Sequence, residues 1–252
     1  LEKAKAAMES GQIAYAGKYS APDYERILAS HCSLAIENTM IYHTPEVKEQ
    51  LEKFGVPVLV ERSSYESGPL ARMEWIKCIG LLLGKSEEAE RIFAEQLARI
   101  EPLLDQDPTG KTVAFFSVTG SNLINVRKGG DYVAQMIAMA GGTYLFADLA
   151  ENGNSLSTMN IPQETFYAKA READVLIYNS TIEGVVDTRR QLIEKCAMLA
   201  DFKAVQSGDC WCTAKSFFQQ TMSLPDLVVD MHRVFTEGDP APEELSLLQK
   251  ID

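Results

Sequence analysis

A long amphipathic segment between Gly84 and Gly110 constrains the fold of this chain more than any other stretch. From Ser86 to Leu104, apolar side chains recur every three or four residues, which is the spacing of one face of an α-helix. Ser86 is a suitable N-cap. Glu87 and Glu88 then place negative charge at the positive end of the helix dipole, where it is stabilising. We therefore predict one helix of about 28 Å over this segment, with Pro102 marking a kink or its end.

Short strand and helix patterns alternate on both sides of this segment. Strands are predicted at residues 13–16, 33–36, 56–60, 112–116, 122–126, 175–178 and 209–213. Helices are predicted from Pro22, Pro45 and Pro69, and at residues 131–140, 162–170, 188–200 and 225–235, with a loop rich in Gly, Asn and Ser at 151–158. This alternation predicts an α/β fold of two small parallel-sheet lobes, joined by one long interdomain helix, with a ligand cleft between the lobes. The expected parts are a truncated N-terminal lobe (1–84), the interdomain helix (85–108) and a C-terminal lobe (109–252).

Composition excludes several classes of partner. The chain has 252 residues, of which 46% are hydrophobic, so it can bury a substantial core. Its net charge of −12 argues against nucleic acid and against an anionic membrane surface, because both require clustered Lys and Arg. No run of 18 apolar residues is present. The chain begins with Leu1 in a helical pattern, so we expect that an N-terminal part, with any targeting signal, has been removed.

Catalytic and metal-binding motifs are weak. The three histidines (His31, His43 and His232) lack metal-ligand spacing, and the chain contains no phosphate loop, dinucleotide fingerprint or nucleophile elbow. We therefore expect no enzymatic activity and no resident metal or cofactor. The five cysteines leave at least one unpaired, and we interpret them as core positions. A metal or redox site on Cys210 and Cys212 is the alternative.

Polar and aromatic side chains gather in the loops that follow the predicted strands. An apolar wall with a few directed polar groups is typical of small-ligand pockets, and an anionic ligand would require arginine in so acidic a chain. An ordinary loop position is the alternative for each residue, and a core position for Trp211. The candidate ligand-binding residues are Lys18, Tyr19, Asn38, Thr39, Arg62, Tyr65, Arg72, Thr119, Arg127, Ser180, Trp211 and Phe217.

Several ordered segments carry a family resemblance. They are residues 22–28 with 34–36, residues 51–59 (Leu-Glu-Lys-Phe-Gly-Val-Pro-Val-Leu), and residues 79–89, 140–142, 173–177 and 202–209. Together they resemble the class III substrate-binding proteins of ABC importers, the periplasmic-binding fold used for ferric siderophores, haem and cobalamin. The likeness runs from about residue 13 to residue 235. Ser33 departs from the aspartate usual before the second strand, and the family's first strand and helix have no counterpart here, so the N-terminal lobe and its part of the cleft are expected to be incomplete.

The resemblance implies a function and partners. It implies a monomeric extracytoplasmic receptor, tethered by an N-terminal lipid that lay upstream, which captures an iron complex and delivers it to the permease of an ABC importer. A ferric siderophore is the first expectation, then haem, and a cobalamin receptor is an alternative. By position, Glu25 and Glu164 would dock on permease arginines, although an acid at the start of a helix also suits the helix dipole. A member of the family that senses or scaffolds without transport is a further alternative.

Overall fold

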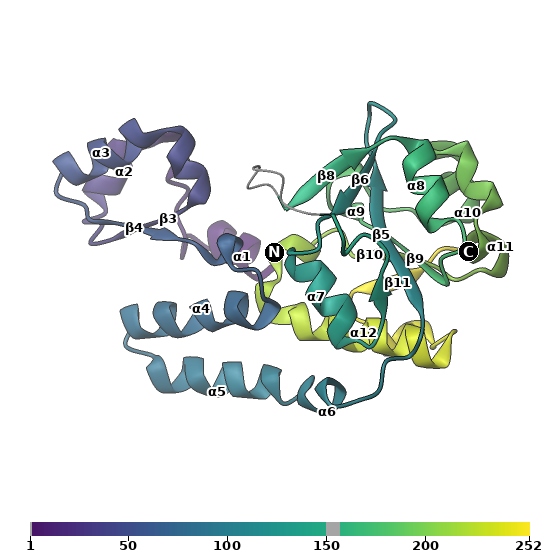
Figure 1. Ribbon diagram of the computed structural model, residues 1–252. Helices are drawn as coiled ribbons and strands as arrows, with labels where there is room; N and C mark the ends of the chain where they lie inside the picture. Colours follow the sequence, from purple (N-terminus) through teal and green to yellow (C-terminus); the bar gives the residue numbers. More distant parts are fainter. Residues whose placement is uncertain (1, 150–156) are drawn as a thin grey trace. The chain divides into compact units, whose positions relative to one another are not determined.

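The computed structural model describes residues 2–149 and 157–252, and the chain divides into two compact units between Tyr65 and Glu66 (Figure 1). Most of the loop predicted at 151–158 lies outside the described residues. The division differs from the predicted boundary at residue 84, because helices α4 (Pro69–Leu82) and α5 (Ser86–Leu97) group with the C-terminal unit.

The N-terminal unit has a small core beneath a two-stranded sheet. Strands β3 (Ala35–Asn38) and β4 (Val58–Glu61) pair in parallel, and Ile41, Val47, Leu51 and Val56 form the buried cluster beside them. The remaining elements are α1 (Glu2–Glu9), β1 (Gly17–Lys18), β2 (Ala21–Pro22), α2 (Tyr24–Ala29), the 3₁₀ turns η1 (Thr39–His43) and η2 (Ser63–Tyr65), and α3 (Pro45–Lys53). Helix α3 begins after Thr44 at Pro45, as predicted.

The strand predicted at residues 13–16 is wrong. The chain instead forms the antiparallel ribbon β1–β2, in which Gly17 pairs with Pro22. Gly17 has a φ of +96°, and a Cβ atom there would lie 2.5 Å from the carbonyl oxygen of Ala21. Only glycine fits so close an approach, so the ribbon forms at Gly17 and not along the apolar residues before it.

The single helix predicted over residues 86–104 is also wrong. Helix α5 ends at Leu97, and a separate short helix, α6 (Glu101–Leu104), follows the buried side chain of Ile100. Pro102 has no N–H to donate to the carbonyl of Ala98, and its ring excludes that carbonyl sterically, so a continuous helix cannot pass through it. Figure 1 shows α4 and α5 side by side as an antiparallel pair.

The C-terminal unit is built on a mixed sheet with the strand order β11-β10-β9-β5-β6-β8, and β7 pairs with β5. Its strands are β5 (Thr112–Val118), β6 (Ile124–Arg127), β7 (Thr143–Tyr144), β8 (Thr158–Ile161), β9 (Val175–Tyr178), β10 (Cys210–Thr213) and β11 (Leu248–Lys250). The pairs among β5, β7, β9 and β10 are parallel, whereas β6, β8 and β11 pair antiparallel. The mainly parallel sheet predicted from sequence is therefore correct only for its centre.

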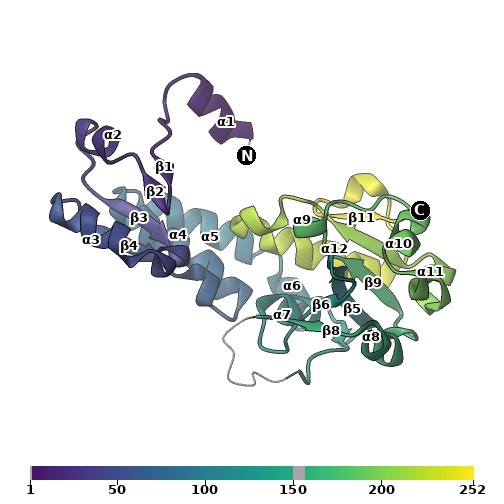
Figure 2. The same ribbon diagram turned by 90° about the horizontal axis from the view of Figure 1, so that it is seen from above.

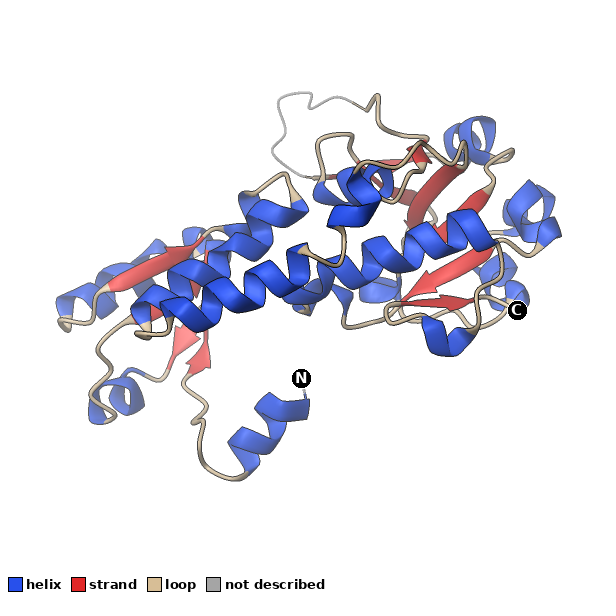
Figure 3. Ribbon diagram, turned by 90° about the horizontal axis from the view of Figure 1, so that it is seen from below, coloured by secondary structure: helices blue, strands red, loops and turns tan. Residues whose placement is uncertain are grey.

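Helices cover both faces of this sheet (Figures 1–3). Phe116 contacts Phe166 on one face at a centroid distance of 4.7 Å, and Phe166 stacks on Phe202 at 5.5 Å. On the other face, Val113 lies near Ile137 and Phe235, around Gly142. The helices of the unit are α7 (Tyr132–Met139), α8 (Gln163–Ala170), α9 (Ser180–Glu183), α10 (Arg189–Lys195), α11 (Lys203–Ser207) and α12 (Leu224–Glu237), with 3₁₀ turns η3 (Ala197–Asp201), η4 (Phe217–Gln219), η5 (Thr221–Ser223) and η6 (Pro242–Glu244). Within the described ranges, no helix has both the length and the hydropathy that a bilayer span requires.

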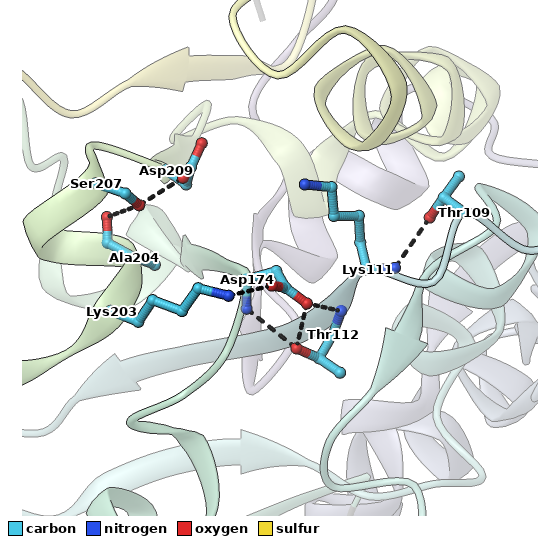
Figure 4. A network of polar contacts seen from close by, with 8 residues as sticks. All are labelled: Thr109, Lys111, Thr112, Asp174, Lys203, Ala204, Ser207 and Asp209. Carbon is cyan, nitrogen blue, oxygen red and sulfur yellow. Dashed lines mark hydrogen bonds and ion pairs between the residues drawn. The ribbon is translucent and has the colours of Figure 1, made fainter.

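A polar network ties the central strands together where β5 and β9 begin (Figure 4). Asp174 accepts hydrogen bonds from the backbone N–H of Thr112 at 2.9 Å, from its hydroxyl at 2.7 Å and from the ammonium of Lys203 at 2.6 Å. Burial raises the pKa of Asp174, but these three hydrogen bonds outweigh burial and lower the pKa to about 2. The carboxylate thus joins β5, β9 and α11 at the end of the sheet where parallel strands start.

Candidate functional site

A buried ion pair lies where β6 ends and α7 begins. Nη1 of Arg127 lies 3.7 Å from Oδ2 of Asp131, and the two side chains are 6% and 1% exposed. Asp131 caps α7, because its Oδ1 accepts a hydrogen bond from the backbone N–H of Val133 at 2.9 Å. The hydroxyl of Tyr144 accepts from the N–H of Arg127 at 3.0 Å and donates to its carbonyl at 2.8 Å. The backbone that carries the guanidinium is therefore fixed.

Aromatic rings from the segment after β10 pack against this pair. Phe217 stacks on Tyr132 at 6.3 Å and on Phe218 at 5.4 Å. The guanidinium of Arg127 lies 4.8 Å from the ring centroid of Phe218, a cation–π distance. Phe217 is buried, but Phe218 remains 41% exposed, so it offers an aromatic face beside the arginine.

A second arginine reaches the same aromatic group from α4. The guanidinium of Arg72 lies 3.8 Å from the ring centroid of Tyr132, and its Nε donates to the carbonyl of Glu66 at 3.0 Å. The Glu66 side chain in turn accepts from the indole N–H of Trp75 at 3.2 Å. We name the group of Arg72, Arg127, Asp131, Tyr132, Phe217 and Phe218 the basic aromatic cluster.

Among the described residues of this cluster, Arg72 and Arg127 are cationic and Asp131 is anionic. The side chain of Lys128, next to Arg127 in sequence, is only 2% exposed. Burial raises the pKa of Asp131, and the nearby Arg127 opposes that rise. Burial also raises the pKa of Tyr132 to about 12, so that phenol stays neutral. Fixed cations beside an exposed aromatic ring can hold an anionic ligand with an apolar or aromatic body.

The structure gives Ser180 and Thr119 local structural contacts. Ser180 is fully buried, and its hydroxyl donates to the carbonyl of Thr213 at 2.5 Å, which ties the residues after β9 to the end of β10. Thr119 closes the turn between β5 and β6, where its hydroxyl contacts Leu123 and Ser121. Thr119 follows β5 and Ser180 comes after β9, as predicted. That either residue contacts a ligand stays a prediction.

Trp211 lies in a strand, within the range 209–213 that the sequence predicts as one. It is the second residue of β10, opposite Ile177 of β9 and Lys250 of β11, and it is 1% exposed. This burial favours the core position, which the sequence left open beside a ligand-binding role.

In the N-terminal unit, several candidate residues come together at the carboxyl ends of β3 and β4. The hydroxyl of Thr39 lies 3.2 Å from that of Ser64, and Asn38 accepts from the backbone N–H of Met40 at 2.8 Å. The guanidinium of Arg62 lies 5.2 Å from the ring centroid of Tyr65, which is 61% exposed. Lys18 and Tyr19 lie instead on the β1–β2 ribbon, and both are exposed.

The two predicted docking acids are both exposed in first helical turns. Glu25 lies in α2, and Glu164 lies in α8. Their carboxylates are therefore accessible, and each also suits the helix dipole.

Sequence reasoning missed Asp131, Tyr132 and Phe218 as members of the cluster. Asp131 and Tyr132 were assigned only to a helix start, although the four-residue spacing from Arg127 was a signal for an ion pair across the β6–α7 turn. Phe218 is adjacent to the predicted Phe217, but no periodicity marks which of the two rings is exposed. Among residues 2–149 and 157–252, no three His, Cys, Asp or Glu side chains gather as a metal site, and Cys196, Cys210 and Cys212 are buried and unpaired thiols.

Comparisons with known proteins connect this fold to one group. No family model matches the sequence, and no curated protein matches it. Many solved structures do match. HutB, a periplasmic haem-binding protein of Vibrio cholerae, aligns with a TM-score of 0.71 and 16% identity over 92% of this chain and 86% of its own.

Two further structures give the same result. A periplasmic haem-binding protein of Pseudomonas aeruginosa has a TM-score of 0.66 and 18% identity, covering 94% of this chain and 83% of its own. An ABC transporter substrate-binding protein of Listeria monocytogenes has a TM-score of 0.64 and 14% identity, covering 91% and 86%. The chain shares its mixed α/β fold with these binding proteins, two of which are named as periplasmic haem-binding proteins. At this identity the likeness shows the fold, and the resemblance inferred from sequence is confirmed at that level.

Proposed function

We propose that this chain is the extracytoplasmic substrate-binding component of an ABC importer, which captures an anionic iron complex and catalyses no reaction. The observation that carries the proposal is the basic aromatic cluster, in which Arg127 is held beside the exposed ring of Phe218 at 4.8 Å. The fold shared with substrate-binding proteins supports the transport role. A ferric siderophore is the first cargo in this proposal and haem the second, since both can combine negative charge with flat apolar surface.

The chemistry of the cluster supports a chelate better than a bare metal ion. Arginine donates to carboxylates and phenolates, and it does not ligate cations. The ring of Phe218 can pack against a conjugated ligand surface while Arg127 and Arg72 offset its charge. Within the N-terminal unit, Thr39, Arg62 and Tyr65 form a separate group of polar and aromatic side chains, which we keep as candidate ligand contacts of that unit alone.

Delivery and location complete the proposal. We place the protein outside the cytoplasm, as a monomer that an N-terminal lipid anchors to the membrane, with Glu25 and Glu164 as the acids that dock on the permease. These features rest on the family resemblance and on the exposure of the two carboxylates.

The decisive experiment is a binding titration with ferric catecholate, ferric hydroxamate, haem, cobalamin and free ferric ion. Fluorescence of Trp75 is a suitable signal, because its indole donates to Glu66, whose carbonyl accepts from Arg72 of the cluster. Saturable submicromolar binding of one iron complex is expected, with neutral cobalamin and free ferric ion at least about tenfold weaker.

A matched pair of arginine variants supplies the control. Arg127→Gln should abolish tight binding, whereas Arg190→Gln, which alters a side chain 88% exposed on α10, should leave it unchanged. Equal loss in both variants, or tight binding of cobalamin alone, contradicts the proposal.

A further inference from the structure

A cavity of about 470 Å³ lies at the open edge of the C-terminal sheet, beside strand β11. This volume is within the range of small-molecule sites, which is roughly 300–1,000 Å³. None of its lining residues belongs to the basic aromatic cluster. They are Trp211, Asp239, Pro240, Pro242, Leu245, Leu248, Gln249, Lys250 and Asp252, and we name this space the edge cavity.

The wall of the edge cavity combines apolar and aromatic side chains with the charged side chains of Asp239, Lys250 and Asp252. Trp211 of β10 is the register partner of Lys250 of β11, and Leu248 pairs with Thr213 two residues further along, so Trp211, Leu248 and Lys250 share one face of the sheet. The segment after α12 contributes two prolines and Leu245 to the lining. The cavity is thus formed by two strands and the chain that leaves α12.

Lys250 supplies a charged hydrogen-bond donor to this lining, and Trp211 supplies an aromatic ring. The indole N–H of Trp211 is itself buried and has no acceptor among the described residues. The ammonium of Lys250 lies 5.7 Å from the centroid of the same indole ring, with its side chain 29% exposed.

The present partner of Lys250 is easily replaced. Its ammonium pairs with the carboxylate of Asp239, whose side chain is 73% exposed. An ion pair this exposed contributes little, because water solvates the carboxylate almost as well. A ligand carboxylate that arrives with an apolar body would pair with Lys250 and add buried contact that Asp239 does not provide.

The outer edge of β11 is too obstructed for a peptide strand. The backbone N–H of Leu248 donates a hydrogen bond to the carboxylate of Asp230 at 3.0 Å. At the other end, Asp252 accepts from the N–H of Arg189 at 2.6 Å and donates to the carbonyl of Asp187 at 3.1 Å. Only the peptide group of Lys250 lies between these two hydrogen-bonded positions. An added strand could therefore not form a continuous series of backbone hydrogen bonds with β11.

From these contacts we propose that the edge cavity is a second binding site, which takes a small organic acid. The carboxylate pairs with Lys250, and the apolar or aromatic body packs against Trp211, Pro240 and Pro242. The site is separate from the proposed iron-complex site and does not depend on it.

Titration calorimetry on the whole chain tests this site with matched probes. Benzoate and indole-3-acetate are the acids, benzamide and indole-3-acetamide their neutral counterparts, and benzylamine the cationic one. We expect the acids to bind at least about tenfold more tightly than the amides and the amine. No acid binding up to the millimolar range, or equal binding of acid and amide, overturns the proposal.

Variants assign the binding to this cavity. Lys250→Met keeps the apolar stem on an edge strand, and it should remove the preference of acid over amide. Lys53→Met, an exposed lysine on α3 of the other unit, is the matched control and should change nothing. A preserved preference in Lys250→Met contradicts the proposal, and circular dichroism and the melting temperature of each variant report whether the fold is intact.

Discussion

Arg127 and Asp131 face each other across the turn between β6 and α7, with Nη1 and Oδ2 at 3.7 Å and both side chains almost fully buried. Removing one member of a buried pair leaves an uncompensated charge, which costs roughly 3–5 kcal/mol, whereas replacing both members is often nearly neutral. The pair can therefore separate effects on binding from effects on folding.

The double variant Arg127→Gln/Asp131→Asn should retain a melting temperature near that of the parent but lose affinity for an anionic iron complex. The physical reason is that the variant lacks the guanidinium of Arg127, which contacts the ligand in our proposal. It also lacks the carboxylate of Asp131, so neither charge of the pair remains buried without its partner. We expect a loss of affinity of about tenfold or more, from the strength of charge-assisted hydrogen bonds. Differential scanning calorimetry and ligand titration on the same samples check this. Unchanged affinity would show that Arg127 does not contact the ligand.

Ligand affinity should depend on the ionisation of Asp131. Its pKa is raised, chiefly by burial and against the opposing charge of Arg127, so the carboxyl becomes neutral at a higher pH than an exposed aspartate does. Protonation removes the negative charge that offsets Arg127 and Arg72, and an anionic ligand should then bind more tightly. Asp131→Asn should bind more tightly at neutral pH and show a flatter pH profile, measured with a ligand that does not titrate in that range.

The same shift has a consequence for stability. Because the folded-state pKa of Asp131 is above the ordinary value of 3.8, its contribution is fully present below that value and is lost as the pH rises through the folded-state pKa. Asp131→Asn keeps an N-cap acceptor but leaves Arg127 without its carboxylate, so it should be less stable than the parent, and its stability should lack the dependence on pH that Asp131 gives the parent. A dependence on pH equal to that of the parent would mean that Asp131 is not the group responsible.

Asp174 should behave in the opposite way. Although burial raises its pKa, bonds from Lys203 and Thr112 outweigh burial and lower the pKa to about 2, from an ordinary value of 3.8. The stabilisation is therefore present above about pH 4 and is lost as the pH falls toward 2. Since the side chain is partly exposed, we expect Asp174→Asn to cost about 1 kcal/mol at neutral pH and to flatten the acid limb of denaturation. Asp148→Asn, at an exposed aspartate paired with Lys169, is the control and should change little.

Helices α4 and α5 pack closely together at Gly80. A Cβ atom on Gly80 would lie 2.4 Å from the Cβ of Ala89, so Gly80→Ala should push the helices apart and destabilise the fold by about 1–3 kcal/mol. Adding Ala89→Gly should recover part of that loss, because it removes the methyl group in the way. Urea denaturation of both variants measures the recovery. Additive destabilisation in the double variant would show that the two positions do not contact.

How far the sequence predicts this fold depends on the kind of signal. Strand β9 was predicted with its bounds, because Val175 to Tyr178 is a short apolar run between polar residues. Strands β8 and β11 were missed, since neither shows clear alternation and their pairing with β6 and β10 is a long-range choice. The spacing of apolar residues extended the predicted helix beyond the end of α5. This spacing carries no information about the backbone hydrogen bond that Pro102 cannot make.

The candidate site shows the same limit. Arg72 and Arg127 were predicted as ligand residues from the need for cations in an acidic chain, and the structure brings both to Tyr132 and its neighbours. For Trp211 the sequence left a ligand position and a core position open, because an aromatic residue after a polar stretch has the same local pattern in a loop and in a buried strand. Burial is decided by β9 and β11, which lie far from Trp211 in sequence.

Transport should depend on Glu25 and Glu164 without any change in ligand affinity. Both carboxylates are exposed, so their reversal to arginine should leave the fold intact and present like charge to a basic permease surface. In cells or vesicles that carry the matching importer, Glu25→Arg and Glu164→Arg should each lower uptake, and the double variant should lower it further. Glu46→Arg, an exposed acid in the first turn of α3, controls for the loss of helix-dipole stabilisation. Normal uptake in the double variant, with ligand binding retained, would show that these acids do not dock, and that the protein delivers its ligand through another surface or serves as a sensor.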